Sequence, residues 1–242
     1  LNFGALITVS LKSKRLKNKA ILNLGEQTII ENIIDRMSKI CEKENIILIT
    51  SNRKIDIPLH KIAKVKKINF FAGDAKDVLE RMSKAANKFK LQNFISTTGD
   101  NPFVDHLYAK KMIKYHIKNK LDFTEISGLS WGAFCYGVNL KALKRIVKNK
   151  KKKDTEVWGN YFRKYKNIKC GIYQIKNKKV FHKKLRLSID YEEDYIFAKK
   201  ILELSKNDFP LSKEIIKIIN KNNKLLNINK NIKQKKIPAK YY

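Results

Sequence analysis

Residues 93–102 read NFISTTGDNP, a short β-branched run that ends in turn-forming residues. The apolar run is typical of a buried strand, and the Gly, Asn and Pro that follow it favour a turn. The pattern therefore predicts a strand over residues 93–97, with Asp100 just beyond the point where this strand ends. Apolar residues at helical spacing then predict a helix over residues 104–117.

Outward from this stretch, short β-branched runs alternate with amphipathic helical patterns. Further strands are expected at residues 5–10, 46–50, 68–72, 133–138, 168–175 and 185–189. Further helices are expected from a capping box at Thr28 and Glu31, after Gly73, and at residues 140–147, 192–204 and 213–220. This alternation predicts an α/β fold, a single Rossmann-like domain whose mainly parallel sheet carries helices on both faces. The domain is expected over residues 1–205, and a short helix and basic tail over residues 206–242.

The composition excludes several classes of protein. The chain has 242 residues and is 43% hydrophobic, which is enough apolar material for a large core and argues against disorder. No stretch approaches the roughly 18 uninterrupted apolar residues of a membrane helix. The three cysteines are far apart and form no C-x-x-C pair, so reduced thiols are expected, and neither a disulfide framework nor a zinc site. With no signal-peptide pattern at the start, a cytoplasmic location is expected.

The charge balance is strongly positive, with 54 Lys and Arg against 22 Asp and Glu, or a formal +32. Such a charge attracts polyanions, and a basic nucleic-acid-binding α/β protein is the alternative to an enzyme. The lysines are spread over nearly every expected helix, however, and the densest runs, residues 148–153 and 221–240, lack interleaved aromatic residues. Those runs are interpreted as a solvated loop and a loosely attached terminus. Nucleic acid is therefore not the expected partner.

The loop after the first expected strand is the first candidate site. It carries Lys12, Ser13, Arg15 and Lys19, and loops after the strands of an open parallel sheet line the ligand crevice. This composition suits a triphosphate, although the loop contains neither a Walker A motif nor G-x-G-x-x-G. In a chain so rich in lysine, an exposed loop without function is the alternative.

Two carboxylates follow expected strands and are candidates to hold Mg²⁺. Asp100 follows the strand at 93–97, and Asp190 follows the strand at 185–189. A parallel sheet can bring both to one edge, where carboxylates can hold Mg²⁺ against phosphate oxygens. The alternatives are an Asx-turn residue for Asp100 and, for Asp190 and the acids after it, a favourable interaction with a helix dipole.

Four motifs in order resemble those of the cytidylyltransferases. They are SKRLKNK at 13–19 followed by Leu24-Gly25, DVLER at 77–81, TGDNP at 98–102, and RLSIDYEED at 186–194. The resemblance is to the superfamily of acylneuraminate and Kdo cytidylyltransferases, and within it to the spore-coat-polysaccharide branch. It covers roughly residues 5–205.

The resemblance implies a nucleotidyltransferase that uses CTP and Mg²⁺. A hydroxyl of a sugar or sugar acid would attack the α-phosphate and give a CMP-sugar and pyrophosphate, for the synthesis of surface polysaccharide or glycan. It implies catalytic roles for Arg15, Lys19 and Asp100 and metal binding by Asp100 and Asp190. The nucleotide-binding residues implied are Lys12, Ser13, Arg15, Lys19, Gly73 and Arg81. A homodimer is compatible with the family, which often forms dimers.

Two positions depart from the family pattern. Ser10 stands where the family usually has an arginine, and Lys17-Asn18 replaces the usual Pro-Gly before the motif lysine. The first change removes one expected phosphate contact, which leaves an inactive family member as a further alternative. Lys12 could compensate for it, as a point charge without the bidentate geometry of arginine.

The acceptor would need an aromatic platform and polar partners. Two segments, residues 122–132 and 154–162, are richer in Trp, Gly and acids than their surroundings, and they resemble a subgroup of the family. Glu125, Trp131, Glu156 and Trp158 are the acceptor-binding candidates. Trp158 also lies four residues before Phe162, a helical spacing that is equally compatible with two core residues.

Overall fold

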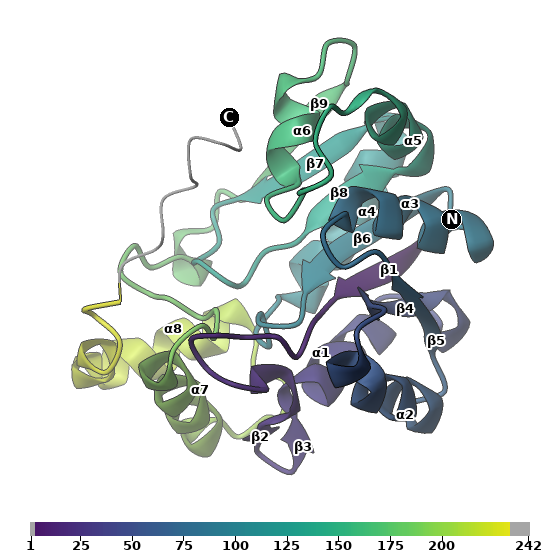
Figure 1. Cartoon of the computed structure of the whole chain (residues 1–242). Coiled ribbons are helices and arrows are strands. Elements are labelled where there is room, and N and C mark those ends of the chain that lie inside the picture. The colour runs from purple at the N-terminus through teal and green to yellow at the C-terminus, as the bar shows by residue number, and fades with distance from the viewer. Residues whose placement is uncertain (1–2, 233–242) are drawn as a thin grey trace.

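The computed structural model describes residues 3–232 and is built around a seven-stranded sheet (Figure 1). Its strands are β1 (Phe3–Thr8), β4 (Ile46–Ser51), β5 (Asn69–Gly73), β6 (Asn93–Thr98), β7 (Phe123–Ser127), β8 (Tyr136–Asn139) and β9 (Cys170–Gln174). The order across the sheet is β5-β4-β1-β6-β8-β7-β9. Only β8 is antiparallel, to β6 on one side and to β7 on the other. The predicted mainly parallel sheet is confirmed.

Eight α-helices connect and cover the strands of the described chain. They are α1 (Ile29–Ser38), α2 (Ile57–Val65), α3 (Val78–Lys88), α4 (His106–Lys118), α5 (Leu140–Asn149), α6 (Gly159–Lys164), α7 (Glu192–Leu204) and α8 (Ser212–Lys221). A hairpin of β2 (Asn23–Leu24) and β3 (Gln27–Thr28) leads into α1. The predicted capping box opens this helix: the Thr28 amide donates to Glu31 Oε2 over 2.9 Å, and the Glu31 amide donates to Thr28 Oγ1 over 3.4 Å.

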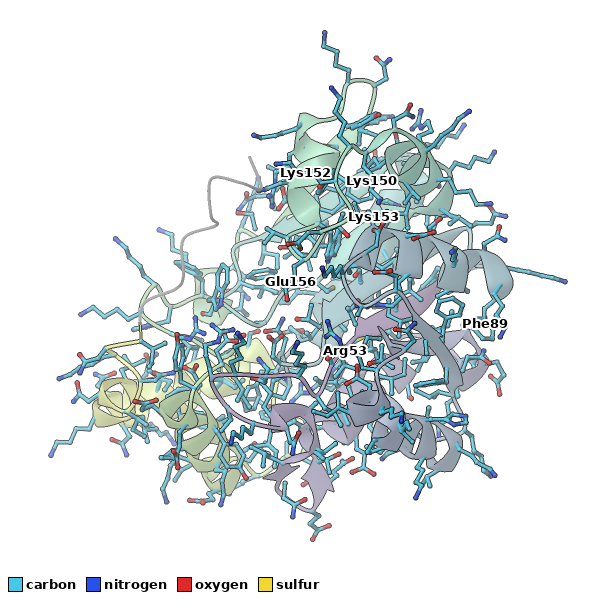
Figure 2. The ribbon with its side chains drawn as sticks, viewed as in Figure 1. Arg53, Phe89, Lys150, Lys152, Lys153 and Glu156 are labelled. Carbon is cyan, nitrogen blue, oxygen red and sulfur yellow. The ribbon has the colours of Figure 1, made fainter. Side chains whose placement is uncertain are left out.

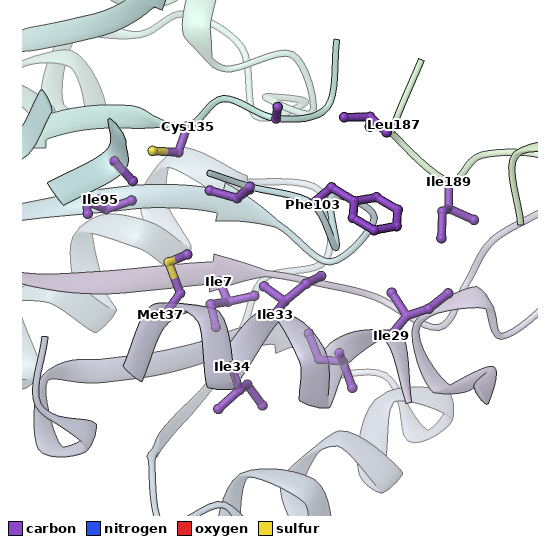
Figure 3. Packing of buried hydrophobic residues seen from close by; sticks show 14 of the residues in the cluster. Ile7, Ile29, Ile33, Ile34, Met37, Ile95, Phe103, Cys135, Leu187 and Ile189 are labelled. Carbon is purple, nitrogen blue, oxygen red and sulfur yellow. The ribbon is translucent and has the colours of Figure 1, made fainter. Parts of the chain in front are cut away.

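Alternation along the strands produces two hydrophobic layers, one on each face of the sheet. In β1, Ala5 and Ile7 belong to the cluster that packs on α1, α4 and α8, whereas Leu6 belongs to the cluster that packs on α3, α5 and α6. Figure 3 shows part of the first cluster, where side chains of α1 lie against β1 and Phe103. Leu187 and Ile189 also belong to this cluster, so the segment that leads to Asp190 is held by the core.

The segment 185–189 is not a strand, which corrects the prediction. It forms one isolated bridge, between Arg186 and Trp131. The Leu187 amide donates to the Trp131 carbonyl and the Ile189 amide donates to the Asp100 carbonyl, both over 2.8 Å. These two carbonyls belong to different loops that connect strands of the sheet. The segment therefore crosses the ends of the strands, and no β-ladder continues along it.

Two helices and one strand of the main sheet were not predicted as regular structure, and neither was the β2–β3 hairpin. The loop expected around Pro58 is α2, since proline is tolerated in the first turn of a helix, where its missing N–H has no partner to lose. The segment interpreted only as an acceptor region contains β7, and α6 follows Trp158.

The end of the described chain packs on the core. Ile215 and Ile219 of α8 and Leu225 of the short 3₁₀ helix η5 (Asn223–Asn227) are buried in the same cluster as α1. The expectation of a loosely attached terminus is therefore wrong for residues 221–232, and the rest of that run lies outside the described residues. The boundary after residue 205 stays a prediction. Among residues 3–232, no helix has the length and apolar composition that crossing a bilayer requires.

Candidate active site

The loop of residues 10–19, called the basic loop below, leaves the carboxyl end of β1 and is anchored at its start by Asp56. The buried Asp56 carboxylate accepts the Leu11 amide over 2.6 Å and the hydroxyl of Ser51. It also accepts the hydroxyl of Ser10, with 3.3 and 3.2 Å to its two oxygens. Sequence reasoning missed Asp56, which belongs to the connection after β4 and to no recognised motif. In Figure 1 the loop continues past α7 toward the β2–β3 hairpin.

Lys19 lies where the basic loop meets the two candidate carboxylates. Its Nζ is 3.0 Å from Asp100 Oδ2 and 3.0 Å from Asp190 Oδ1, and it donates to the Ile189 carbonyl over 2.8 Å. The structure therefore brings Lys19, Asp100 and Asp190 together at the carboxyl edge of the sheet, although 90 residues separate the two aspartates in the sequence.

Asp190 is the more enclosed carboxylate, with 8% of its side chain exposed against 26% for Asp100. Arg15 Nη2 lies 2.7 Å from its Oδ1, and Arg186 Nη2 lies 2.6 Å from its Oδ2. Burial by itself would raise the pKa of Asp190, but the charges of Lys19, Arg15 and Arg186 outweigh it and lower this pKa below its usual range. Asp190 is therefore ionised at neutral pH.

A second layer of side chains supports Asp190. Asp194 accepts the Asp190 amide and Arg186 Nε, each over 3.0 Å. Asn229 Nδ2 donates to Asp194 Oδ1 over 3.0 Å and to the Arg186 carbonyl over 3.2 Å. The interpretation of Asp194 as only a helix-dipole residue was therefore incomplete. No local pattern in the sequence pointed to Asn229.

Asp100 is held by side chains of its own turn, and these contacts are not the backbone hydrogen bond of an Asx-turn. Thr98 Oγ1 donates to Asp100 Oδ1 over 2.5 Å, and Asn101 Nδ2 donates to Thr98 Oγ1 over 2.9 Å. The Oδ2 atom faces Lys19. The turn thus orients the carboxylate toward the basic loop.

The two carboxylates suit a small divalent cation. Within residues 3–232 no group of three His, Cys, Asp or Glu side chains could by itself hold a metal ion. Oxygens of Asp100 and Asp190 nevertheless converge on a single positive charge, the Lys19 ammonium. Mg²⁺ commonly takes one or two protein carboxylates and completes its coordination with phosphate oxygens and water, so this donor set fits it.

The other predicted nucleotide-binding residues lie around the same edge. Gly73 ends β5, and a Cβ there would lie 3.1 Å from Arg81 Cγ, so glycine leaves room for this arginine. Arg81 is buried, and its Nη1 donates to the Asp74 carbonyl over 2.6 Å. Lys12 and Ser13 lie on the basic loop, where the Lys12 amide donates to Ser10 Oγ over 3.2 Å and the Lys12 side chain is exposed.

The acceptor candidates divide into exposed and buried residues. Trp131 is 44% exposed and packs edge-to-face on Phe134, with 5.4 Å between ring centroids. Glu156 is exposed. Glu125 forms a bidentate pair with Arg163, with 3.0 Å from Nε to Oε2 and 2.5 Å from Nη2 to Oε1. Arg163 was not predicted, because no local pattern links it to Glu125.

Trp158 does not offer its ring to solvent, which corrects its assignment as an acceptor contact. It is 6% exposed and lies edge-on to Tyr136, with 5.3 Å between centroids, and to Phe123, with 6.1 Å. Phe162, four residues later, is fully buried beside it. The core alternative for this spacing therefore describes Trp158.

Comparisons with known proteins identify relatives of this chain. The family model described as Cytidylyltransferase matches residues 5–237. The uncharacterized protein MJ1063 of Methanocaldococcus jannaschii is 30% identical, with 95% of each chain covered. The spore coat polysaccharide biosynthesis protein SpsF of Bacillus subtilis is 25% identical, with 90% of this chain and 93% of the relative covered.

Solved structures show the same fold. A cytidylyltransferase from Leptospira borgpetersenii superposes with a TM-score of 0.86 at 22% identity, covering 98% of this chain and all of the other. A CMP:2-keto-3-deoxy-manno-octonic acid synthetase, determined in complex with CTP, superposes with a TM-score of 0.63 at 8% identity, covering 83% of this chain and 98% of the other.

Proposed function

The chain belongs to the cytidylyltransferase family, and from that premise we propose that it transfers CMP from CTP to a hydroxyl of a sugar or sugar acid and releases pyrophosphate. The observation that carries the proposal is the contact of one ammonium, Lys19 Nζ, with both Asp100 and Asp190. It unites three of the motif residues at the sheet edge where ligands bind in α/β folds. The same contact places positive and negative groups side by side, as a site for a triphosphate and its counterion requires.

Arg15 and Lys19 would hold the triphosphate of CTP. Both lie on the basic loop, and Arg15 is oriented by Asp190 and by the ring of Tyr191, 5.2 Å from the guanidinium carbon. A guanidinium held from two sides presents its remaining N–H groups in a fixed direction, which suits bidentate contact with phosphate. Lys12 would add charge at the exposed side of the loop, and Gly73 and Arg81 would border the nucleoside.

Asp100 and Asp190 would hold Mg²⁺, which when bound neutralises charge on the phosphate oxygens. Asp190 needs no protonation change for this role, since it is ionised at neutral pH. Transfer between oxygens is an in-line displacement in which positioning and charge neutralisation supply most of the rate enhancement. The residues of this site thus act by holding the α-phosphate and the leaving pyrophosphate in line, and no protein nucleophile is required.

The acceptor would bind beside Trp131, at the same edge of the sheet. The Trp131 carbonyl accepts the Leu187 amide, so the backbone of this exposed residue lies beside the segment that leads to Asp190. An exposed indole is a platform for a sugar ring, and Glu125 and Glu156 would supply polar contacts. The name of the Bacillus relative and the Kdo-activating structural neighbour support an acylneuraminate-like or Kdo-like acceptor used in surface polysaccharide synthesis, and we place the reaction in the cytoplasm.

Ser10 is compatible with activity in this arrangement. Its hydroxyl lies against Asp56, inside the anchor of the loop. Arg15 and Lys19, the two cations proposed to hold the triphosphate, do not depend on this position for their contacts with Asp100 and Asp190. An active enzyme is therefore proposed, against the alternative of an inactive member.

Pyrophosphate release tests the proposal directly. The protein is incubated with each of the four nucleoside triphosphates, Mg²⁺ and a panel of 2-keto-3-deoxy sugar acids and neutral sugars. We expect release with CTP and one class of acceptor, and loss of release when Mg²⁺ is chelated. Release with none of the combinations, together with RNA binding that falls steeply with salt, would instead identify a nucleic-acid-binding protein.

A further inference from the structure

A buried ion pair at the start of α3 is outside the site described so far. Asp77 and Lys150 form it, with 3% and 8% of their side chains exposed. Asp77 also accepts the Glu80 amide over 3.1 Å and thereby caps α3. A lysine in a run of basic residues is normally solvated, so this burial indicates that residue 150 has a structural role. The expectation of a solvated loop is wrong for Lys150.

Thr155 joins the same network and adds a backbone connection. Its hydroxyl donates to Asp77 Oδ1 over 3.1 Å and accepts the Leu79 amide over 3.0 Å, and its own amide donates to the Lys76 carbonyl over 3.1 Å. Asp77 thus holds the chain at Lys150 and again at Thr155. The DVLER motif at 77–81 is in this way tied to a segment that follows it by more than 70 residues.

The other end of this segment is fixed by aromatic packing. Trp158 lies edge-on to Tyr136, and Tyr136 lies edge-on to Phe134, with 5.9 Å between centroids. Phe134 in turn contacts the exposed ring of Trp131. Residues 150–158, which we call the wall segment, therefore run from the start of α3 to the aromatic row that ends at the candidate acceptor platform.

We propose that Asp77 is a positioning residue that fixes the wall segment along the crevice and thereby sets the affinity for the acceptor. This inference rests on the proposed function. The wall segment carries the exposed Glu156, and Figure 2 shows Lys150, Lys152 and Lys153 close together above it. When Asp77 holds Lys150 and Thr155, Glu156 and the backbone of Trp158 keep one position relative to Trp131.

The affinity for CTP should not depend on this network. The triphosphate-binding side chains come from the basic loop, which is anchored by Asp56 and by the contacts of Lys19. The side-chain contacts of the Asp77 network do not involve that loop, and the guanidinium of Arg81, which would border the nucleoside, is held by its own hydrogen bond to the Asp74 carbonyl. Release of the wall segment should therefore weaken acceptor binding and leave CTP binding unchanged.

Three variants of the full chain test the inference. Lys150→Met removes the ammonium and keeps the apolar stem. The double variant Asp77→Asn with Lys150→Met leaves no unpaired charge in the interior, and the asparagine can still cap α3. Lys150→Arg keeps the cation and serves as the rescue. Lys144→Met is the matched control, because it removes one positive charge from an exposed side chain of α5 that donates to Asn87 over 2.6 Å.

Two measurements report on the wall segment without any substrate. One is the rate of tryptic cleavage after residues 151–153. The other is the fluorescence of Trp158 in a Trp131→Phe background, in which it is the sole tryptophan because the chain has two. We expect faster cleavage and red-shifted emission in Lys150→Met and in the double variant. Lys150→Arg and Lys144→Met should resemble the parent.

Kinetics with the acceptor found in the panel complete the test. We expect KM for the acceptor to rise about tenfold in the double variant, because a small displacement of a binding wall is costly, while the Kd for CTP stays within about twofold. Unchanged cleavage and unchanged acceptor KM would overturn the inference, and so would an equal loss of CTP affinity. If no acceptor is found with the parent, the proposed function and the acceptor claim fail together, and cleavage and emission still decide whether Asp77 anchors the wall segment.

Discussion

Two groups of charged side chains lie near the carboxyl edge of the sheet, and they differ in how completely they are closed. Around Lys19, the carboxylate of Asp100 and the guanidinium of Arg15 remain partly accessible to solvent, while Asp190 beside them is enclosed. Around Asp77, the partners Lys150 and Thr155 are buried, and both carboxylate oxygens are used. The first group is an open cluster and the second a closed one.

The difference shows which charges can exchange partners. In the open cluster, a ligand can reach the charged side chains from solvent. Phosphate oxygens or a divalent cation could therefore replace their present side-chain partners. In the closed cluster, removing one partner leaves the other charge buried without compensation, which is strongly unfavourable. Similar ion pairs would thus serve the proposed binding site in one place and hold the chain in the other.

Neutralising the carboxylates of the open cluster should have the largest effect. We expect Asp100→Asn and Asp190→Asn each to lower turnover by orders of magnitude, because the residues would hold one cation together. The double variant should lose much less than the product of the two, since residues that act as a unit are not additive. Turnover is measured at saturating CTP, acceptor and Mg²⁺, and circular dichroism checks the fold. Near-parent turnover in Asp100→Asn would remove its catalytic assignment.

Breaking the closed cluster should affect stability more than breaking an exposed pair does. Lys150→Met is expected to lower the free energy of unfolding by about 3–5 kcal/mol, the usual cost of leaving one charge of a buried ion pair without its partner. Arg145→Met, which removes the half-exposed pair of Arg145 with Asp122, should cost about 0–1 kcal/mol. Urea unfolding of both variants gives the comparison. Equal losses would mean that the closed cluster contributes no more to stability than an exposed ion pair does.

Removing cations from the open cluster should weaken nucleotide binding. We expect Arg15→Ala and Lys19→Ala each to reduce the binding free energy of CTP by roughly 1.5–3 kcal/mol, the range for a hydrogen bond to a charged group. Titration calorimetry with CTP and Mg²⁺ measures this loss. Arg145→Ala is the control, and parent-like binding in both loop variants would place the nucleotide elsewhere.

A buried neutral pair distant from both clusters should respond to pH. His116 Nδ1 lies 2.8 Å from Thr124 Oγ1, and burial lowers the pKa of His116 from 6.5 to about 4. Between these values the unfolded chain binds a proton that the folded chain does not, so stability should fall as the pH falls. The expected loss between pH 7 and pH 5 is about 2 kcal/mol. In His116→Gln this part of the dependence of stability on pH should disappear. An unchanged pH dependence would assign it to other groups.

Much of the fold follows from local patterns, because parallel strands bury both faces and helices bury one. The alternation between residues 5 and 117 predicted β1, β4, β5 and β6, and it placed Asp100 at the correct edge. The prediction for residues 185–189 was wrong as secondary structure, yet it put Asp190 near Asp100. This apolar run is buried as a strand would be, but it crosses the strand ends.

The contacts that sequence reasoning missed join residues far apart in the chain. Asp56 anchors the loop after β1, Lys150 pairs with Asp77, and Arg163 pairs with Glu125. None of these pairs repeats with the period of a helix or a strand, and lysine is so common in this chain that a buried one has no compositional signal. Such partners become visible only when the topology brings the elements together.

The hydrogen bonds of Asn229 also have a consequence for how the protein is made. Asp190 is held through Arg186 and Asp194, and Asn229 fastens both of these. During synthesis, the basic loop and Asp100 emerge from the ribosome well before Asn229 does. A nascent chain can therefore complete its sheet while the second carboxylate still lacks its support.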